Sequence, residues 1–170
     1  MTLVTEVVPL QSDLPRVEYR WDFDTEILSG RLSGASADPE SQGVIEMGGP
    51  GGSFVSLGLA GPVMTGLEVV VWPPSESVSE LVPPASKRRG HLKIYPNTEE
   101  RTTGVVELKV PLGCEKSSDK SIIHIVVGNP RTVESVTVAD KLLAEVDSDR
   151  HLAGFWLIDV PPFPEAGPHR

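Results

Sequence analysis

Acidic side chains alternate in the run Asp22-x-Asp24-x-Glu26, a spacing that occurs in calcium-binding loops. A loop of the EF-hand type would have a glycine at its sixth position and a bidentate Glu at its twelfth. Ile27 and Ser33 occupy those positions, so the run is typical of a solvent-facing turn between strands. The same interpretation applies to Asp147-Ser148-Asp149. We therefore expect no metal site.

Histidine and cysteine are the next candidates for chemistry. The four histidines are scattered, with no two at metal-binding spacing: His91, His124, His151 and His169. His124 alternates with Ile123 and Ile125, which is typical of a core or interface histidine with satisfied hydrogen bonds. Cys114 is the only cysteine, which excludes an internal disulfide and favours a reducing, cytoplasmic location. A nucleophilic pair of Cys114 with a histidine is conceivable, but its polar loop-like surroundings do not favour one.

Phosphate-binding and hydrolase motifs are the remaining catalytic possibilities. The glycines between Gly48 and Gly52 are not followed by Lys-Ser or Lys-Thr, so they predict a flexible hairpin connection. The sequence contains no Gly-x-Ser-x-Gly motif. We expect no catalytic residues and no cofactor.

The charge and composition of the chain disfavour some classes of binding partner. The chain has 170 residues and a formal net charge of −9, which disfavours nucleic-acid binding because phosphate backbones are repelled. No stretch approaches the roughly 20 apolar residues of a membrane-spanning helix. The first ten residues lack a basic start and contain Glu6 and Pro9, so we expect no signal peptide.

The elements that would position these residues are strands. Apolar and polar residues alternate along most of the chain, and 16 Gly and 16 Pro punctuate it. The stretch Leu142 to Pro162 is typical of strand, turn and strand, with Pro161-Pro162 as the stop. The stretch 54–74 has the same pattern 88 residues earlier, so that Gly66 matches Gly154. The sequence predicts an all-β protein of two tandem β-meanders packed together as a barrel or sandwich.

This duplication divides the chain into five parts. We expect an N-terminal arm at 1–15, repeat one at 16–74, a Pro/Ser-rich connector at 75–90, repeat two at 91–162 and a tail at 163–170. The strands Leu67 to Trp72 and Phe155 to Val160 are apolar on both faces, so we expect both to be covered on both sides. The segment Leu112 to Lys120 is predicted to be a polar loop.

Two stretches carry a family resemblance. Trp21 to Leu32 resembles the opening Tyr-Asp-Pro-Glu-Ala-Asp-Ala-Leu-Tyr-Ile-Arg-Leu of a family of short bacterial proteins of unknown function. Leu142 to Asp159 is similar to that family's second half, which ends Gly-Ile-Glu-Ile-Leu-Asp. This chain would be a diverged tandem of a unit that is usually single. The resemblance implies no catalytic residues. It implies a protein partner at most, because the family's genes are often predicted to belong to toxin–antitoxin-like pairs.

Two functional hypotheses follow. The first is a non-enzymatic, antitoxin-like module that binds a protein partner or forms a homo-oligomer. The alternative is a small-molecule binding barrel or an enzyme with a site between the repeats. The residues expected to line that site are Trp72, Trp156, Glu68, Asp159 and His124.

Overall fold

The computed structural model describes residues 2–34, 42–96 and 104–164. This part of the chain contains fourteen strands and one short 3-10 turn, which confirms the predicted all-β class. None of its helices is long and apolar enough to cross a membrane. The elements are β1 Leu3–Pro9, β2 Val17–Trp21, β3 Leu28–Leu32, β4 Gln42–Gly48, η2 Pro50–Gly52, β5 Phe54–Ala60, β6 Val63–Val71, β7 Ser75–Val78, β8 Arg88–Pro96, β9 Val105–Lys109, β10 Leu112–Ser117, β11 Ile123–Val127, β12 Val133–Ala139, β13 Leu142–Asp147 and β14 Leu152–Leu157.

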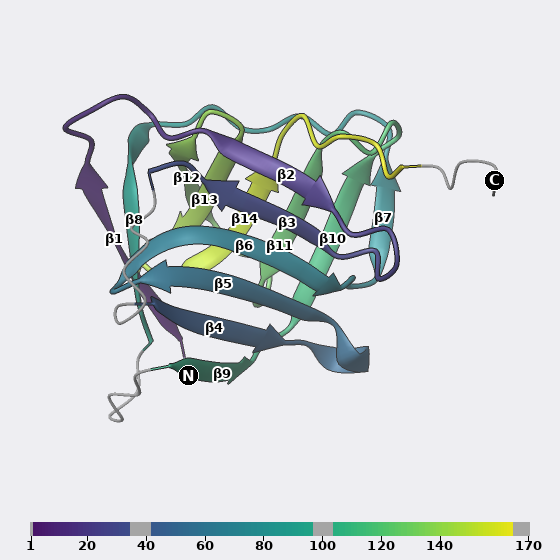
Figure 1. The fold of residues 1–170 in the computed structure, drawn as a ribbon, viewed down its shortest axis with the longest axis horizontal. Helices are drawn as coiled ribbons and strands as arrows, with labels where there is room; N and C mark the ends of the chain where they lie inside the picture. The colour runs from purple at the N-terminus through teal and green to yellow at the C-terminus, as the bar shows by residue number, and fades with distance from the viewer. Residues whose placement is uncertain (1, 35–41, 97–103, 165–170) are drawn as a thin grey trace.

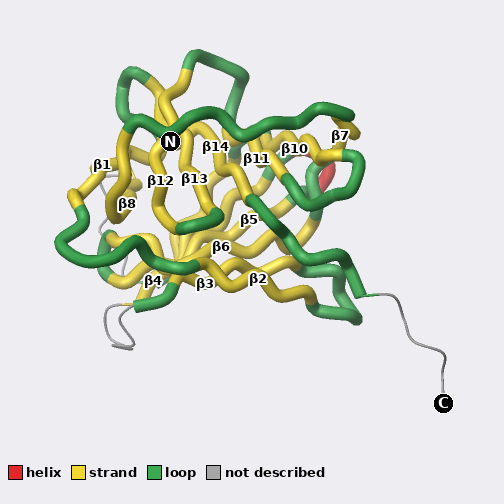
Figure 2. Tube along the Cα trace, turned by 90° about the horizontal axis from the view of Figure 1, so that it is seen from above, coloured by secondary structure: helices red, strands yellow, loops and turns green. Residues whose placement is uncertain are grey.

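Eleven of these strands form one hydrogen-bonded path, in the order β7-β10-β11-β14-β13-β12-β8-β6-β5-β4-β9. We call β9, β4, β5 and β6, together with β3 and β2 beside β6, the front half. The back half is β7, β10, β11, β14, β13 and β12, and β8 joins the two. The path curls, so that the front half lies over the back half with its strands crossing those behind (Figure 1). The view from above shows the same two layers (Figure 2).

The inner faces of the two halves form one apolar core. In β5, Val55, Leu57 and Leu59 are buried while the residues between them are partly exposed, which is the period of two that a strand imposes. Ile45 of the front half and Phe155 of the back half belong to one contiguous cluster, and both are 0% exposed. Packed side chains therefore fill the space between the halves.

The same strand order occurs in both halves. The front order β2-β3-β6-β5-β4 corresponds to the back order β10-β11-β14-β13-β12. Val17 lies opposite Leu32 in β2–β3, and the residues 95 positions later, Leu112 and Val127, lie opposite each other in β10–β11. The two halves are thus related in topology and in the register of this hairpin.

The glycines matched by the sequence lie in equivalent strands. A Cβ added to Gly66 in β6 would meet the backbone oxygen of Gly30 in β3, and one added to Gly154 in β14 would meet that of Ile125 in β11. The β5–β6 and β13–β14 hairpins differ in register by one residue, however. Gly66 lies opposite Gly58, whereas Gly154 lies opposite Glu145.

The expected N-terminal arm contains a full strand. β1 pairs with β8 along its whole length, from Leu3 opposite Pro96 to Pro9 opposite Gly90. Thr5 is 2% exposed, and its backbone N–H and hydroxyl both donate to the carbonyl oxygen of Arg150. Both prolines lie at strand ends, where they cost the ladder little.

Two expectations were wrong, and the connector contains structure of its own. The segment Leu112 to Lys120 is not a loop, because it contains β10, whose Leu112 and Cys114 are buried. The connector begins with a strand, β7, that pairs with β10, and its Leu81 is only 9% exposed. The strand at Leu67 to Trp72 is not covered on both sides, because Glu68 is exposed and Val71 is 47% exposed.

Candidate functional site

The five residues predicted to line a site do not gather in one place. His124 and Trp156 come together on the outer face of the back half, where β11 and β14 pair with these two residues opposite each other. Glu68 lies on the outer face of the front half, and Trp72 lies just beyond the end of β6. Asp159 follows β14 with a side chain that is 65% exposed. No common site between the halves joins these five residues.

The His124 imidazole lies between two carboxylates. Its Nδ1 is 2.9 Å from Oε1 of Glu115 on β10, and its Nε2 contacts Oε1 of Glu145 on β13. The side chains of His124 and Glu145 are only 13% and 8% exposed, whereas that of Glu115 is 36% exposed. Alternation on β10, β11 and β13 places all three side chains on the outer face.

These contacts require a doubly protonated ring. An ionised carboxylate only accepts hydrogen bonds, so both ring nitrogens must donate, and only the imidazolium can do that. Burial alone would lower the pKa of His124, but the hydrogen bonds that its ring donates to Glu145 and Glu115 outweigh burial and raise the pKa above its ordinary value. The imidazolium also stacks on the Trp156 indole, with ring centroids 4.1 Å apart and an angle of 9° between the planes.

A glycine makes room for the inner carboxylate. Glu145 lies opposite Gly154, and a Cβ on Gly154 would come within 2.7 Å of Oε1 of Glu145. The Glu145 side chain can therefore lie over β14 and reach His124 on the next strand. The sequence contains a signal for this contact, because Leu142 to Val146 is an apolar strand with a single carboxylate and the next strand contains a glycine. The sequence does not reveal the register that places the two residues opposite each other.

The connector covers this cluster. Leu81 packs with Leu143 and Trp156 in a second, smaller apolar cluster, with Val78, Ile122 and Ile158 at its margin. Trp156 is 7% exposed, and its Nε1 is buried without a hydrogen-bond partner among the described residues. Trp156 therefore lies between the connector and the cluster formed by Glu115, His124 and Glu145.

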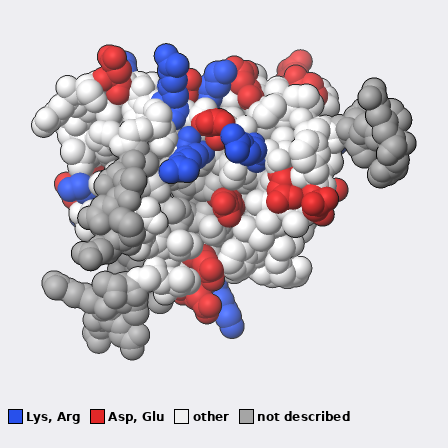
Figure 3. All heavy atoms as spheres, in the orientation of Figure 1, with Lys and Arg blue, Asp and Glu red and all other residues white. Residues whose placement is uncertain are grey.

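The corresponding outer face of the front half is open. A hollow of about 780 Å³ lies over β2 to β6 and β9, and its lining includes Ser56, Thr65 and Glu68. Glu68 lies opposite Ser29 on one side and Ser56 on the other, so a row of short polar side chains crosses the face. Figure 3 shows this face of the molecule, with acidic and basic residues along its upper edge, near its centre and lower down, among uncharged residues.

Trp72 belongs to an aromatic cluster at one end of the molecule. Its ring stacks on Trp21 at 5.7 Å, Phe163 meets Trp21 edge-on at 5.3 Å, and Nζ of Lys116 lies 3.9 Å from the Trp72 ring centroid. The indole N–H groups of Trp21 and Trp72 donate to the carbonyl oxygens of Pro161 and Glu26. These contacts anchor the segments after β14 and β6 and are structural.

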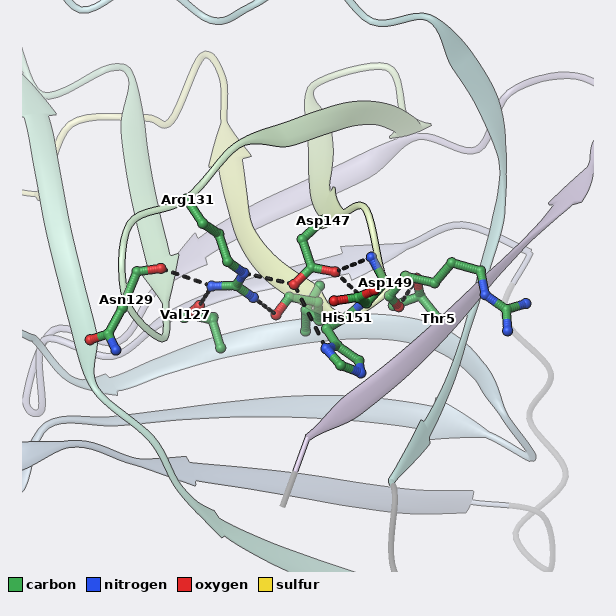
Figure 4. A network of polar contacts seen from close by, with 9 residues as sticks. Thr5, Val127, Asn129, Arg131, Asp147, Asp149 and His151 are labelled. Atoms are coloured by element: carbon green, nitrogen blue, oxygen red, sulfur yellow. Dashed lines mark hydrogen bonds and ion pairs between the residues drawn. The ribbon is translucent and has the colours of Figure 1, made fainter.

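Asp147, Asp149 and His151 bring three potential metal ligands within 4.8 Å of one another. In Figure 4 the oxygens of Asp147 are already engaged by other groups. Oδ1 accepts the backbone N–H groups of Asp149 and His151, and Oδ2 accepts Nε of Arg131 at 2.7 Å. Arg131 also donates to three carbonyl oxygens, those of Val127, Asn129 and Leu152. The arrangement is a turn tied to β11 and β14 by one arginine.

Two further candidates prove structural. Cys114 lies opposite Ile125 and is 4% exposed on the inner face, whereas His124 faces outward, so the two cannot form a nucleophile–base pair. Asp22 accepts the backbone N–H groups of Asp24 and Thr25 at 2.9 and 3.2 Å. These bonds hold the turn and lower the pKa of Asp22.

In comparisons with known proteins, no family model matches this sequence, and no curated protein matches it.

Proposed function

We propose that the protein is a non-enzymatic binding module, built from two copies of one β-meander, that takes an extended polypeptide segment of a partner protein on the outer face of its front half. The recurrence of one strand order in both halves supports the duplication. The dispersal of Trp72, Trp156, Glu68, Asp159 and His124, and the filled core between the halves, weigh against the alternative of a small-molecule or catalytic site between the repeats.

The observation that carries the proposal is the contrast between two matching faces. In the back half, the outer face over β11, β14 and β13 lies under an extended segment, in which Leu81 packs on Leu143 and Trp156. In the front half, the outer face over the corresponding strands β3, β6 and β5 has no cover among the described residues and forms the open hollow. The fold therefore already holds one extended segment across one such face, and the same geometry is free on the other.

The surface of the hollow indicates the chemistry of the segment. Hydroxyl groups of Ser29, Ser56 and Thr65 can pair with peptide N–H and C=O groups. The lining supplies charges of both signs, from Glu18 and Glu68 and from Arg20 and Arg31, which would fix the direction of a segment with complementary charges. We therefore expect a polar, extended segment with a basic side chain placed to meet Glu68.

Selection from a random peptide library on the immobilised full chain tests this. Selected peptides should shift the backbone NMR signals of Ser56, Thr65 and Glu68, and Glu68→Arg should weaken their binding at least about tenfold, as the loss of a charged contact does. Glu107→Arg is the matched control, because it makes the same change at an exposed position of β9 outside the hollow. Peptides whose signals map elsewhere, or that bind Glu68→Arg unchanged, would refute the proposed face.

A further inference from the structure

We infer that residues 79–86 of the connector form a strap whose hold on the back half is controlled by protonation of His124. This inference is independent of the front-face binding proposal. The strap covers Trp156, and Trp156 in turn covers the His124 ring. A change in the charge of that ring therefore acts directly beneath the strap.

Acidic side chains surround the His124 ring, so the contacts of the ring depend on its charge. Glu115 and Glu145 contact the ring, and Glu76 on β7 lies opposite Glu115 in a parallel pair, so both point to the same face. β14 contributes no charged group there, and the strap's own charged residue, Glu80, is exposed. One imidazolium thus contacts two carboxylates, and a third, Glu76, lies on the same face beyond Glu115.

Loss of the proton breaks one of the two contacts. A neutral imidazole donates from a single nitrogen, so the other would present a lone pair to a carboxylate. Glu145 has little access to water, so the remaining N–H stays on Nε2 towards Glu145, and the lone pair of Nδ1 then faces the carboxylate of Glu115. Loss of the ring's charge also removes its cation–π attraction to the Trp156 indole, which loosens the surface on which Leu81 packs.

The strap is fastened at its ends and free to open between them. At one end β7 pairs with Cys114 to Ser117 of β10. At the other, the backbone N–H of Lys87 donates to Ser135 and Nε of Arg88 bonds Glu134 at 2.5 Å. Between these points Leu81 is the one buried side chain, and Val82 is 73% exposed. Opening would uncover Trp156, Leu143 and Leu81 as an apolar surface for a partner.

NMR on the full chain tests this by following the His124 ring, the Leu81 methyl groups and the strap amides between about pH 6 and about pH 9. As His124 loses its proton, the Leu81–Trp156 nuclear Overhauser effects should vanish. The hydrogen-exchange rates of the strap amides, corrected for intrinsic rates, should then rise roughly tenfold or more. This change is equivalent to the loss of one hydrogen bond to a charged group. A core methyl of Leu57 serves as the internal reference.

Two variants complete the test. Glu76→Gln removes an exposed carboxylate and should move the strap transition to lower pH without loosening the strap at about pH 6. His91→Gln, on β8, should leave the transition unchanged. The inference is overturned if His124 titrates while the Leu81 signals and strap exchange stay constant, or if strap opening follows a pH at which His124 does not titrate.

Discussion

Gly154 lies directly opposite Glu145, and the carboxylate of Glu145 occupies the space in which a side chain at position 154 would stand. One residue without a Cβ therefore allows a buried acid to reach a histidine two strands away. The same glycine lies close to the carbonyl oxygen of Ile125, so that two neighbours constrain this position.

Gly154→Ala should destabilise the fold by about 1–3 kcal/mol, because the added methyl group meets backbone on one side and the Glu145 carboxylate on the other. It should also lower the pKa of His124 by displacing Glu145. Gly113→Ala is the control, since a Cβ there meets Val126 at 3.7 Å, an ordinary contact. Denaturant unfolding with an NMR titration of His124 measures both effects, and equal losses for the two variants would contradict the assignment.

The stability of the protein should depend on the protonation of His124. Its pKa is raised in the folded state, so the stabilisation is complete below the unfolded value of about 6.5 and is lost as pH rises through the folded value. The loss is about 1.4 kcal/mol for each unit that separates the folded and unfolded pKa values. Unfolding free energies above about pH 6 should fall with pH in the wild type and stay flat in His124→Gln. A wild-type curve that rises over this range would contradict the contacts.

The acid side of the stability curve should depend on Asp147. Partial burial acts to raise its pKa, but hydrogen bonds from the His151 backbone, Arg131 and the Asp149 backbone outweigh this and lower it. Its stabilisation is therefore present above the ordinary value near 3.8 and is lost as pH falls through the folded value. Asp147→Ala should cost about 1.5–3 kcal/mol at neutral pH. Asp149→Ala, which removes an exposed neighbour, should reduce the free energy of unfolding much less. Thermal melts of the two variants at neutral and acidic pH measure the difference.

Both faces of β14 should be sensitive to truncation. Phe155 is 0% exposed in the main core and Trp156 is 7% exposed under the connector, so Phe155→Ala and Trp156→Ala should each cost about 3–5 kcal/mol. Asp159 is largely exposed at a positive φ of 55°, which Asn tolerates, so Asp159→Asn should change the free energy of unfolding by less than about 1 kcal/mol. Denaturant melts measure all three, and a small loss at Trp156 would mean that the connector leaves this face open.

Much of the fold followed from local pattern. Alternating apolar residues predicted most strands, and the apolar composition of Phe155 to Val160 predicted the burial of Phe155 and Trp156 on opposite faces. The strand at Leu112 was missed because Gly113, Glu115, Lys116 and Ser117 form a polar run whose pairing with β7 and β11 supplies what local preference does not. Missing that strand also hid Glu115, one of the two partners of His124.

The grouping of the site residues was less predictable. His124 and Trp156 meet because β11 pairs with β14, a contact between strands some 30 residues apart that no spacing reveals. Glu68 and Asp159 were grouped through the predicted repeat, yet they lie on different halves, because Glu68 is on β6 and Asp159 follows β14. Local patterns identify strands and faces, whereas register determines which side chains meet.

Two strands tie the halves of the molecule together. β1 precedes the front half yet bonds β8 and, through Thr5, the turn at Arg150 of the back half, while β9 precedes β10 yet extends the front half beside β4. These contacts connect segments that are far apart in the sequence. The protein should therefore melt in a single transition, with calorimetric and van't Hoff enthalpies that agree, rather than one half at a time.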